Sequence, residues 1–208
     1  MTTDGPKQLA GRVALVPGAS RGIGAACATG LPRRWRQRQH RRPDEQALST
    51  LAERLDAPGR VLALATDVTD AAALSRLIDA TRERFGRLYA AVNNAGNIHR
   101  PAPIADINPD EFDRVVAADL RGVYLSMRAE IPAMLDAGGG TVVNISSAAG
   151  IKGAPGRGAF AAAKAGVIAL TRTAALAYAA RHIRVNAVVP DRSWRDRSST
   201  VHHRRAST

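Results

Sequence analysis

The 208-residue sequence predicts an α/β fold built as a doubly wound parallel sheet in a single domain. Short apolar runs of strand length alternate with longer segments of helical periodicity. A glycine-rich turn follows the first apolar run and opens a helix. The runs are rich in Val, Ala, Leu and Ile, as strands buried on both faces are. We therefore expect helices on both faces of the sheet.

Five strands are expected, each ending in a turn or a polar segment. The residues between them are too numerous for hairpin turns and suit crossover helices, which parallel strands require. The expected strands are 13–16, 61–65, 88–92, 141–145 and 183–189.

The helices between these strands carry recognisable start and stop signals. Asp70 is a candidate N-cap for a helix whose apolar face holds Leu74, Leu77, Ile78 and Phe85. Asn108-Pro109-Asp110-Glu111 begins another helix, with a cap, a proline in the first turn and acids near the positive dipole end. Glycines 138–140 end it, and its apolar stripe comprises Phe112, Val115, Val116, Leu120, Val123, Tyr124, Met127 and Ile131.

Residues 159–180 form the longest apolar segment. Lys164, Arg172 and several threonines interrupt it, so we interpret it as a buried amphipathic helix and not as a membrane span. A single cysteine, Cys27, fits a reducing compartment, and residues 1–12 lack an apolar core of signal-peptide length. We expect a cytoplasmic protein that makes no contact with membranes.

The net charge of +12 is concentrated in two tracts. Residues 30–43 carry six arginines and no acid, and residues 191–208 carry five arginines and two aspartates, so the tracts hold nine of the twelve charges. The remainder is ordinary for an enzyme. We expect one domain over residues 1–190 and a disordered basic tail over residues 191–208. Nucleic-acid binding is the alternative that such a charge raises.

The glycine turn "PGASRGIG" has the chemistry of a phosphate site. Gly18, Gly22 and Gly24 let backbone approach a pyrophosphate, and the following helix offers free N–H groups at its N-terminus. The spacing differs from the usual dinucleotide fingerprint, and a structural glycine turn is an equal alternative when the motif is taken alone.

Further motifs follow the turn in order: Asp67 in "DVT", "NNAG" at 93–96, Ser147 in "NISSAAG", Lys164 and "RVNAVVP" ending at Pro190. With these, residues 12–190 resemble the classical short-chain dehydrogenase/reductase family, and 3-oxoacyl-thioester reductases in particular. The resemblance implies a Rossmann-type fold that binds NADP(H) or NAD(H) at the carboxyl ends of the strands.

The resemblance also assigns roles to single residues. Ser147 would polarise a substrate carbonyl, and Lys164 would bind the nicotinamide ribose and lower the pKa of a tyrosine four residues before it. Arg21 favours NADP(H), because a cation there can meet a 2′-phosphate. The implied cofactor-binding residues are Gly18, Ser20, Arg21, Gly22, Ile23, Gly24, Asp67, Val68, Asn94, Ala95, Gly96, Lys164 and Pro190, with no metal.

Three site positions depart from the family pattern. Phe160 stands where the family has its proton-donating tyrosine, and it has no hydroxyl. Asp119 stands where the family has an asparagine that orders a water for proton relay. It is either a carboxylate bonded locally to backbone, which we favour, or an altered relay. Pro17 replaces a residue that would supply an N–H to the glycine turn.

The two basic tracts fall where the family has its second strand and its substrate loop with a final strand. Six arginines in 30–43 cannot occupy a sheet centre, so we predict an incomplete sheet. Shared composition suggests a frame-shifted reading of both tracts. Genuine basic insertions are the alternative.

The sequence therefore predicts an NAD(P)-dependent oxidoreductase, impaired by Phe160, that reduces a small-molecule carbonyl or oxidises an alcohol. A homodimer or homotetramer is expected. A non-catalytic cofactor-binding pseudoenzyme and a basic nucleic-acid-binding protein are the alternatives.

Overall fold

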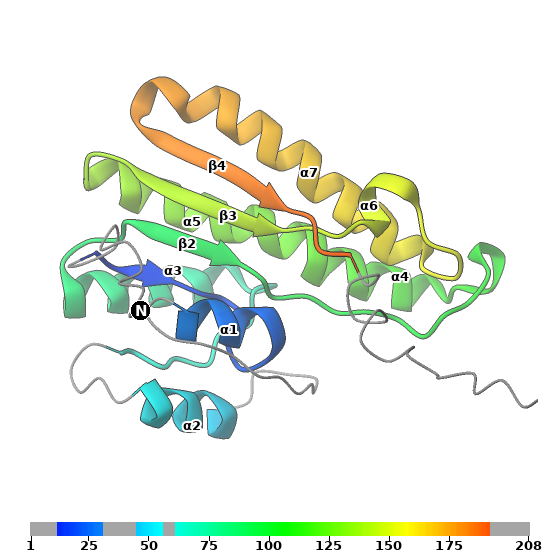
Figure 1. Cartoon of the computed structure of the whole chain (residues 1–208), viewed down its shortest axis with the longest axis horizontal. Helices are drawn as coiled ribbons and strands as arrows, with labels where there is room; N and C mark the ends of the chain where they lie inside the picture. Colours follow the sequence, from blue (N-terminus) through cyan, green and yellow to red (C-terminus); the bar gives the residue numbers. More distant parts are fainter. Residues whose placement is uncertain (1–11, 31–44, 56–60, 192–208) are drawn as a thin grey trace, which may run out of the picture.

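The computed structural model describes residues 12–30, 45–55 and 61–191 (Figure 1). Within them lies one four-stranded sheet in the order β1-β2-β3-β4, with every pair parallel. Its strands are β1 (Ala14–Leu15), β2 (Ala90–Asn93), β3 (Gly140–Ile145) and β4 (Ile183–Val188). This confirms the α/β class and four of the five predicted strands.

The register brings the carboxyl ends of the strands to one edge. Asn93 pairs with Asn144, and Ile145 pairs with Val188. The glycine turn, the "NNAG" segment, Ser147 and Pro190 all follow these strand ends directly, so the parallel arrangement gathers them at the same edge.

The prediction of a strand at residues 61–65 is wrong. These residues have no ladder pairing, and Leu62 and Leu64 are 36% and 42% exposed. In a doubly wound sheet this strand would pair with the second strand, expected from residues that lie outside the described ranges. No described strand lies beside it, so its backbone makes no ladder.

One helical layer packs on the sheet. It contains α3 (Ala71–Phe85), α4 (Pro109–Val116), α5 (Gly122–Asp136) and α7 (Gly158–Tyr178). Contacts run from α3 to α5, from α4 to α7 and from α7 to β4. The main core lies between this layer and the sheet and includes Leu88, Val123, Met134, Val142, Val167 and Ile183.

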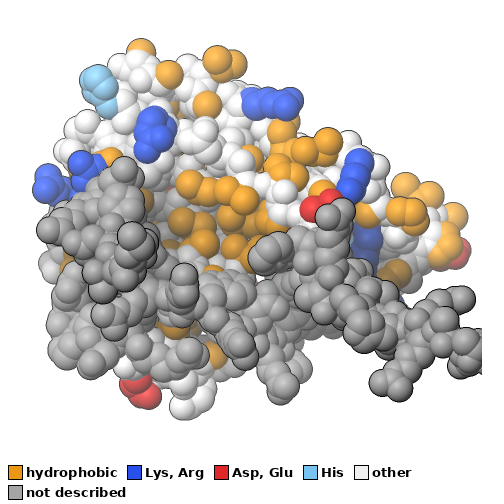
Figure 2. Space-filling view, in the orientation of Figure 1, with side chains coloured by type: hydrophobic (Ala, Val, Ile, Leu, Met, Phe, Trp, Pro, Cys, Tyr) orange, Lys and Arg blue, Asp and Glu red, His pale blue; other side chains and the backbone are white. Residues whose placement is uncertain are grey.

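The other face of the sheet is covered less completely. Figure 1 shows α1 (Gly22–Gly30) in front of the sheet and α3 and α5 behind it. Alternate residues of β3 and β4 stay partly or largely exposed, among them Val143, Asn186 and Val188. Figure 2 shows apolar side chains in the middle of this face. The expectation of full cover on both faces therefore fails at β3 and β4 among the described residues.

The predicted helix caps are present. The Asp70 side chain accepts a hydrogen bond from the Ala72 N–H at 2.8 Å, and the Asn108 side chain accepts one from the Asp110 N–H at 2.8 Å. Gly138 and Gly139 adopt positive φ after α5, where residues with a Cβ would be strained. Residues 45–55, "EQALSTLAERL", form α2 (Glu45–Leu55).

The long helix predicted from residue 109 is divided by a π-helical turn, η3 (Ala117–Arg121). The wider turn changes which side chains face the core. Phe112 and Tyr124 are 40% and 47% exposed, which corrects their placement on the buried stripe, whereas Val115 and Met127 are buried as predicted. Such π-turns occur often at functional sites.

Residues 158–181 have the length and apolar composition of a membrane span, with a mean hydropathy of 1.3. They form α7 and the 3-10 turn η4 (Ala179–Arg181), packed along β4 and against α6 (Ala149–Lys152). Ala159, Ala163 and Val167 face the core. Core helices of soluble proteins pass the same compositional test, so this feature is weak evidence for a span.

The tracts 30–43 and 191–208 lie outside the described residues except for Gly30 and Asp191. The lack of a second strand in the first tract and the disorder of the basic tail therefore stay predictions.

Candidate functional site

The glycine turn is held against the "NNAG" segment. The Asn94 side-chain amide donates to the Gly18 carbonyl at 3.1 Å, and the Asn94 N–H donates to the Pro17 carbonyl at 3.3 Å. A Cβ on Gly18 would lie 2.7 Å from the backbone of Ala95. Pro17 therefore still contributes its carbonyl to the turn, although it lacks an N–H.

The start of α1 fits a pyrophosphate. Gly22 has φ +56°, and a Cβ there would meet nothing within 4 Å, so the backbone is open on that side. Ser20 and Arg21 precede the helix, and Ile23 and Gly24 lie in its first turn, where N–H groups have no partner within the helix. An open backbone at a positive dipole end is the chemistry that phosphate needs.

Asp67 and Val68 also lie toward this edge. The Asp67 carboxylate is exposed and accepts bonds from the N–H and the hydroxyl of Thr69, both at 2.8 Å, which closes a tight turn. Val68 is buried against Leu74 and Leu125. Val68 thus anchors the turn, while the Asp67 carboxylate stays accessible to solvent.

Ser147 follows β3 and is partly exposed. Its hydroxyl oxygen accepts a bond from the Ala149 N–H at 3.2 Å, and the neighbouring Ala148 N–H donates to the Pro190 carbonyl at 3.0 Å. Pro190 therefore closes the strand end that carries Ser147. The hydroxyl proton of Ser147 is available to a ligand.

Lys164 is buried in α7, with 4% of its surface exposed. Its ammonium donates to the Ile145 carbonyl at 3.0 Å and lies 3.1 Å from Asp119 Oδ1. The Ser146 hydroxyl donates to the Lys164 carbonyl at 2.8 Å, which fixes this turn of α7 to the end of β3. Lys164 is therefore held by two contacts at its ammonium and by one at its backbone carbonyl.

Phe160 lies one helical turn before Lys164, on the same side of α7. The Lys164 ammonium is 5.6 Å from the centre of the Phe160 ring. A hydrocarbon ring thus faces the ammonium that would otherwise act on a phenol.

Asp119 is 1% exposed and lies in the π-helical turn η3. Its Oδ2 accepts the Asn97 N–H at 2.6 Å, as the local interpretation predicted, and Oδ1 pairs with Lys164, which that interpretation did not include. Burial raises the pKa of Asp119 above its ordinary value, and Lys164, the Asn97 N–H and Arg114 oppose that rise.

The sequence profile of the short chain dehydrogenase family matches residues 12–193. The chain belongs to this family. It is 37% identical over 186 residues to levodione reductase of Leifsonia aquatica, covering 88% of this chain and 70% of that protein. It is 37% identical over 184 residues to a 3-oxoacyl-(acyl-carrier-protein) reductase of Synechocystis, covering 88% and 74%.

Solved structures of short chain dehydrogenases agree with the fold. The crystal structure of levodione reductase matches with a TM-score of 0.79 at 35% identity, covering 87% of this chain and 71% of the other. An NAD⁺-bound xylitol dehydrogenase matches with a TM-score of 0.81 at 32% identity, covering 89% and 72%. The Rossmann-type arrangement predicted from the motifs is confirmed.

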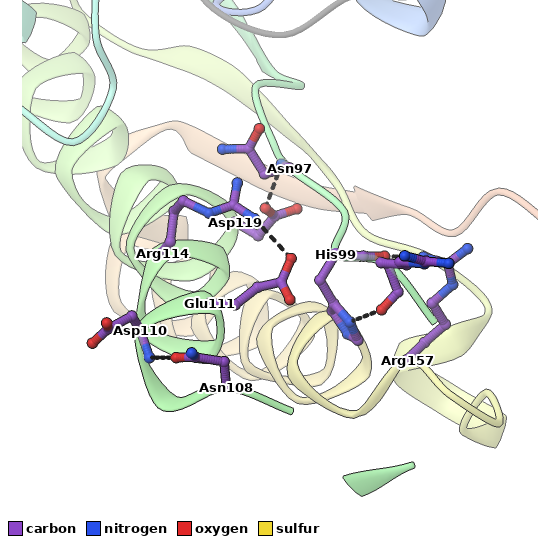
Figure 3. A network of polar contacts seen from close by, with 9 residues as sticks. Asn97, His99, Asn108, Asp110, Glu111, Arg114, Asp119 and Arg157 are labelled. Atoms are coloured by element: carbon purple, nitrogen blue, oxygen red, sulfur yellow. Dashed lines mark hydrogen bonds and ion pairs between the residues drawn. The ribbon is translucent and has the colours of Figure 1, made fainter. Parts of the chain in front are cut away.

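The sequence did not single out His99 and Arg157, two residues that support the candidate site. His99 is 1% exposed, its Nδ1 lies 2.7 Å from the Arg100 carbonyl, and its own carbonyl accepts a bond from Arg157 (Figure 3). The loop after "NNAG" is thereby tied to the start of α7. A histidine next to an arginine gives no periodic signal, so sequence patterns could not find this contact.

A cavity of about 520 Å³ lies elsewhere, at the amino ends of the strands. Arg12, Arg87, Tyr89, His182 and Arg184 are among its lining residues. None of the predicted site residues lines it. The candidate site is the carboxyl edge, because the motifs, the open glycine and the buried Lys164 converge there.

Proposed function

We propose that this chain binds a nicotinamide dinucleotide at the carboxyl edge of the sheet and that its reduction of carbonyls, or oxidation of alcohols, is impaired. Membership of the short chain dehydrogenase family supports the reaction class. Phe160, facing Lys164 where the family has a phenol, carries the impairment.

The glycine turn and the first turn of α1 would hold the pyrophosphate through backbone N–H groups. Asp67 and Val68 would border the adenine, and Asn94, Ala95 and Gly96 would line the dinucleotide. The bound cofactor supplies or accepts a hydride. The dinucleotide-binding half of the site thus keeps the residues it needs.

Ser147 would orient the substrate carbonyl by donating its hydroxyl proton to the carbonyl oxygen. Phe160 can neither donate nor accept a proton, so the oxygen that becomes an alkoxide has no positioned acid. Loss of a positioned acid slows reactions by roughly 100- to 10,000-fold. Tyr124 lies on α5 with its side chain 47% exposed, and the described residues show no hydrogen bond between it and Ser147 or Lys164.

NADP(H) is the cofactor we favour, because Arg21 precedes α1 and a guanidinium can meet a 2′-phosphate. Crystal structures of two relatives contain the cofactor: a xylitol dehydrogenase with NAD⁺, and a 3-ketoacyl-(acyl-carrier-protein) reductase of Brucella melitensis with NADH. NAD(H) is therefore the alternative. Fluorescence titration with NADPH and NADH separates the two.

The experiment that tests the function compares the parent chain with F160Y. Both are titrated with NADPH and assayed with simple ketones and a 3-oxoacyl thioester. We expect both to bind NADPH and F160Y to turn over at least tenfold faster. A parent chain that turns over as fast as F160Y contradicts the impairment, and a chain that binds neither dinucleotide contradicts the function.

A non-catalytic cofactor-binding protein is the second candidate. It is favoured by the ion pair between Lys164 and Asp119, because that pair engages the one buried Lys or Arg among the residues that the structure describes. Tight dinucleotide binding with no turnover in either the parent or F160Y would support it.

We further infer a cytoplasmic homodimer that pairs through the long helices. Phe112 on α4, Tyr124 on α5 and Leu176 on α7 expose apolar side chains, with Leu176 85% exposed. Light scattering coupled to gel filtration tests this, since L176D should give a monomer.

A further inference from the structure

The charge of Lys164 is matched by a carboxylate. Asp119 Oδ1 lies 3.1 Å from the Lys164 ammonium, and the two side chains are 1% and 6% exposed. Ion pairs in such surroundings are screened little by solvent. A second donor direction of the ammonium is used by the Ile145 carbonyl at 3.0 Å.

The carboxylate is also fixed in place. Asp119 Oδ2 accepts the Asn97 N–H, and a Cβ on Gly96 would lie 2.5 Å from Oδ1. Figure 3 shows Asp119 pointing from its helix toward Asn97. The π-helical turn thus delivers a carboxylate between the "NNAG" backbone and Lys164, where it cannot swing away without losing both contacts.

We propose that the Asp119 carboxylate offsets the charge of the Lys164 ammonium. It holds the ammonium toward η3 and cancels the positive field of the ammonium at position 160. Asp119 is then a positioning residue, acting through Lys164. The proposal deepens the proposed function by adding a second lesion, independent of the missing hydroxyl.

The physical consequence concerns any phenol placed at position 160. A lone cation nearby lowers the pKa of a phenol, because it favours the phenolate. A carboxylate about 3 Å from that cation turns it into a dipole, whose field falls faster with distance than that of a single charge. Restoring the tyrosine alone would therefore restore an acid of nearly ordinary pKa.

Other charges around this site do not replace the lost field. Arg114 on α4 pairs with Glu111 at 3.2 Å, and Lys152 on α6 pairs with Asp191 at 2.8 Å. Arg157 precedes α7 and donates to the His99 carbonyl. Arg114, Lys152 and Arg157 are partly or largely exposed, so solvent screens their charges. His99 is buried.

The test measures the introduced phenol directly. F160Y, F160Y/D119N and the control F160Y/D113N are titrated by tyrosinate absorbance, each against its Phe160 parent, which subtracts the three native tyrosines. Asp113 is exposed on α4, so D113N removes the same charge in solvent. Asparagine at 119 can still accept the Asn97 N–H.

We expect the phenol of F160Y to titrate near its ordinary value of about 10, and D119N to lower that pKa by about one pH unit or more. D113N should leave it unchanged. Equal titration of F160Y and F160Y/D119N would overturn the proposal. If D119N does not fold, as judged by circular dichroism, D119S provides the neutral variant, with the same two outcomes.

A second readout follows the lysine. D119N in the Phe160 background should tighten NADPH binding by roughly tenfold, because the released ammonium can reach the ribose. The phenol titration needs no cofactor. A chain that binds no dinucleotide but shows the D119N effect on the phenol would refute the proposed function and leave this inference standing.

Discussion

Glu130 Oε2 accepts a hydrogen bond from the Asn93 side-chain amide at 3.1 Å inside the main core, and that amide also donates to Asn144 Oδ1 at 3.0 Å. The Asn144 side-chain amide in turn donates a hydrogen bond to the Thr171 hydroxyl at 2.9 Å. Helix α5, strands β2 and β3, and α7 are therefore joined by one buried polar network beside the carboxyl edge of the sheet. Burial raises the pKa of Glu130 to about 7.

This network predicts a stability that falls as pH rises. The unfolded chain releases the Glu130 proton near pH 4.5, whereas the folded chain keeps it until about pH 7. Between these values the folded state binds more protons, so the free energy of unfolding drops by about 1.4 kcal/mol per pH unit, on the order of 3 kcal/mol in all. Above pH 7 this contribution is flat.

Urea unfolding of the parent and E130Q at pH 5, 6, 7 and 8 checks this prediction. E130Q should lack the slope and should be the more stable protein at pH 8. E83Q, which removes an exposed carboxylate from α3, should keep the parent's slope. Parallel curves for the parent and E130Q would show that Glu130 is ionised throughout.

The buried pair of Lys164 and Asp119 predicts a large cost for removing one partner. K164M leaves the Asp119 carboxylate in the core without its cation, which typically costs about 3 to 5 kcal/mol. The double variant K164M/D119N should recover part of that loss. Urea unfolding of the parent, K164M, D119N and K164M/D119N gives the coupling energy of the pair.

Lys152 and Asp191 provide the matched control, because they also form an ion pair, at 2.8 Å, but their side chains are 65% and 42% exposed. K152M should change the free energy of unfolding by less than about 1 kcal/mol. Similar losses for K152M and K164M would mean that burial does not govern the pair.

Local signals in the sequence predicted most of what holds the site. The caps at Asp70 and Asn108, the glycine stop after α5 and four strands depend on near neighbours in the chain, so propensity and periodicity reveal them. Glu130 was missed although it falls on the apolar stripe three residues after Met127. A carboxylate at a core position is a signal for a buried network, and its partners come from two distant strands.

The errors arose where a long-range partner decides the outcome. Residues 61–65 are apolar enough for a strand but find no neighbouring strand among the described residues. Phe112 and Tyr124 fit an ideal helical stripe, and the π-helical turn between them shifts the phase. Asp119 was correctly expected to bond to backbone, yet only the folded chain brings Lys164 to its second oxygen.

The Asp70 cap gives a prediction about α3. D70A removes the acceptor of the Ala72 N–H and should lower the free energy of unfolding by about 1 kcal/mol. D79A, at an exposed position within the same helix, should change it by no more than about 0.5 kcal/mol. Thermal unfolding of both variants measures the difference, and equal values would rule out a capping role.

Gly24 predicts an effect opposite to ordinary helix propensity. Alanine in place of glycine within a helix usually stabilises by about 1 kcal/mol. At Gly24 the added Cβ would lie 2.2 Å from the Gly18 carbonyl oxygen and 2.6 Å from the Asn94 side-chain nitrogen, so the glycine turn must move. G24A should lower the free energy of unfolding by about 1 to 3 kcal/mol and weaken NADPH binding.

A26G, in the same helix, is the control for helix propensity alone. It should lower the free energy of unfolding by about 1 kcal/mol without changing NADPH affinity beyond twofold, roughly 0.4 kcal/mol. A G24A protein as stable as the parent and equal to it in NADPH affinity would show that the turn tolerates the methyl group and that close packing of α1 on Gly18 does not shape the dinucleotide site.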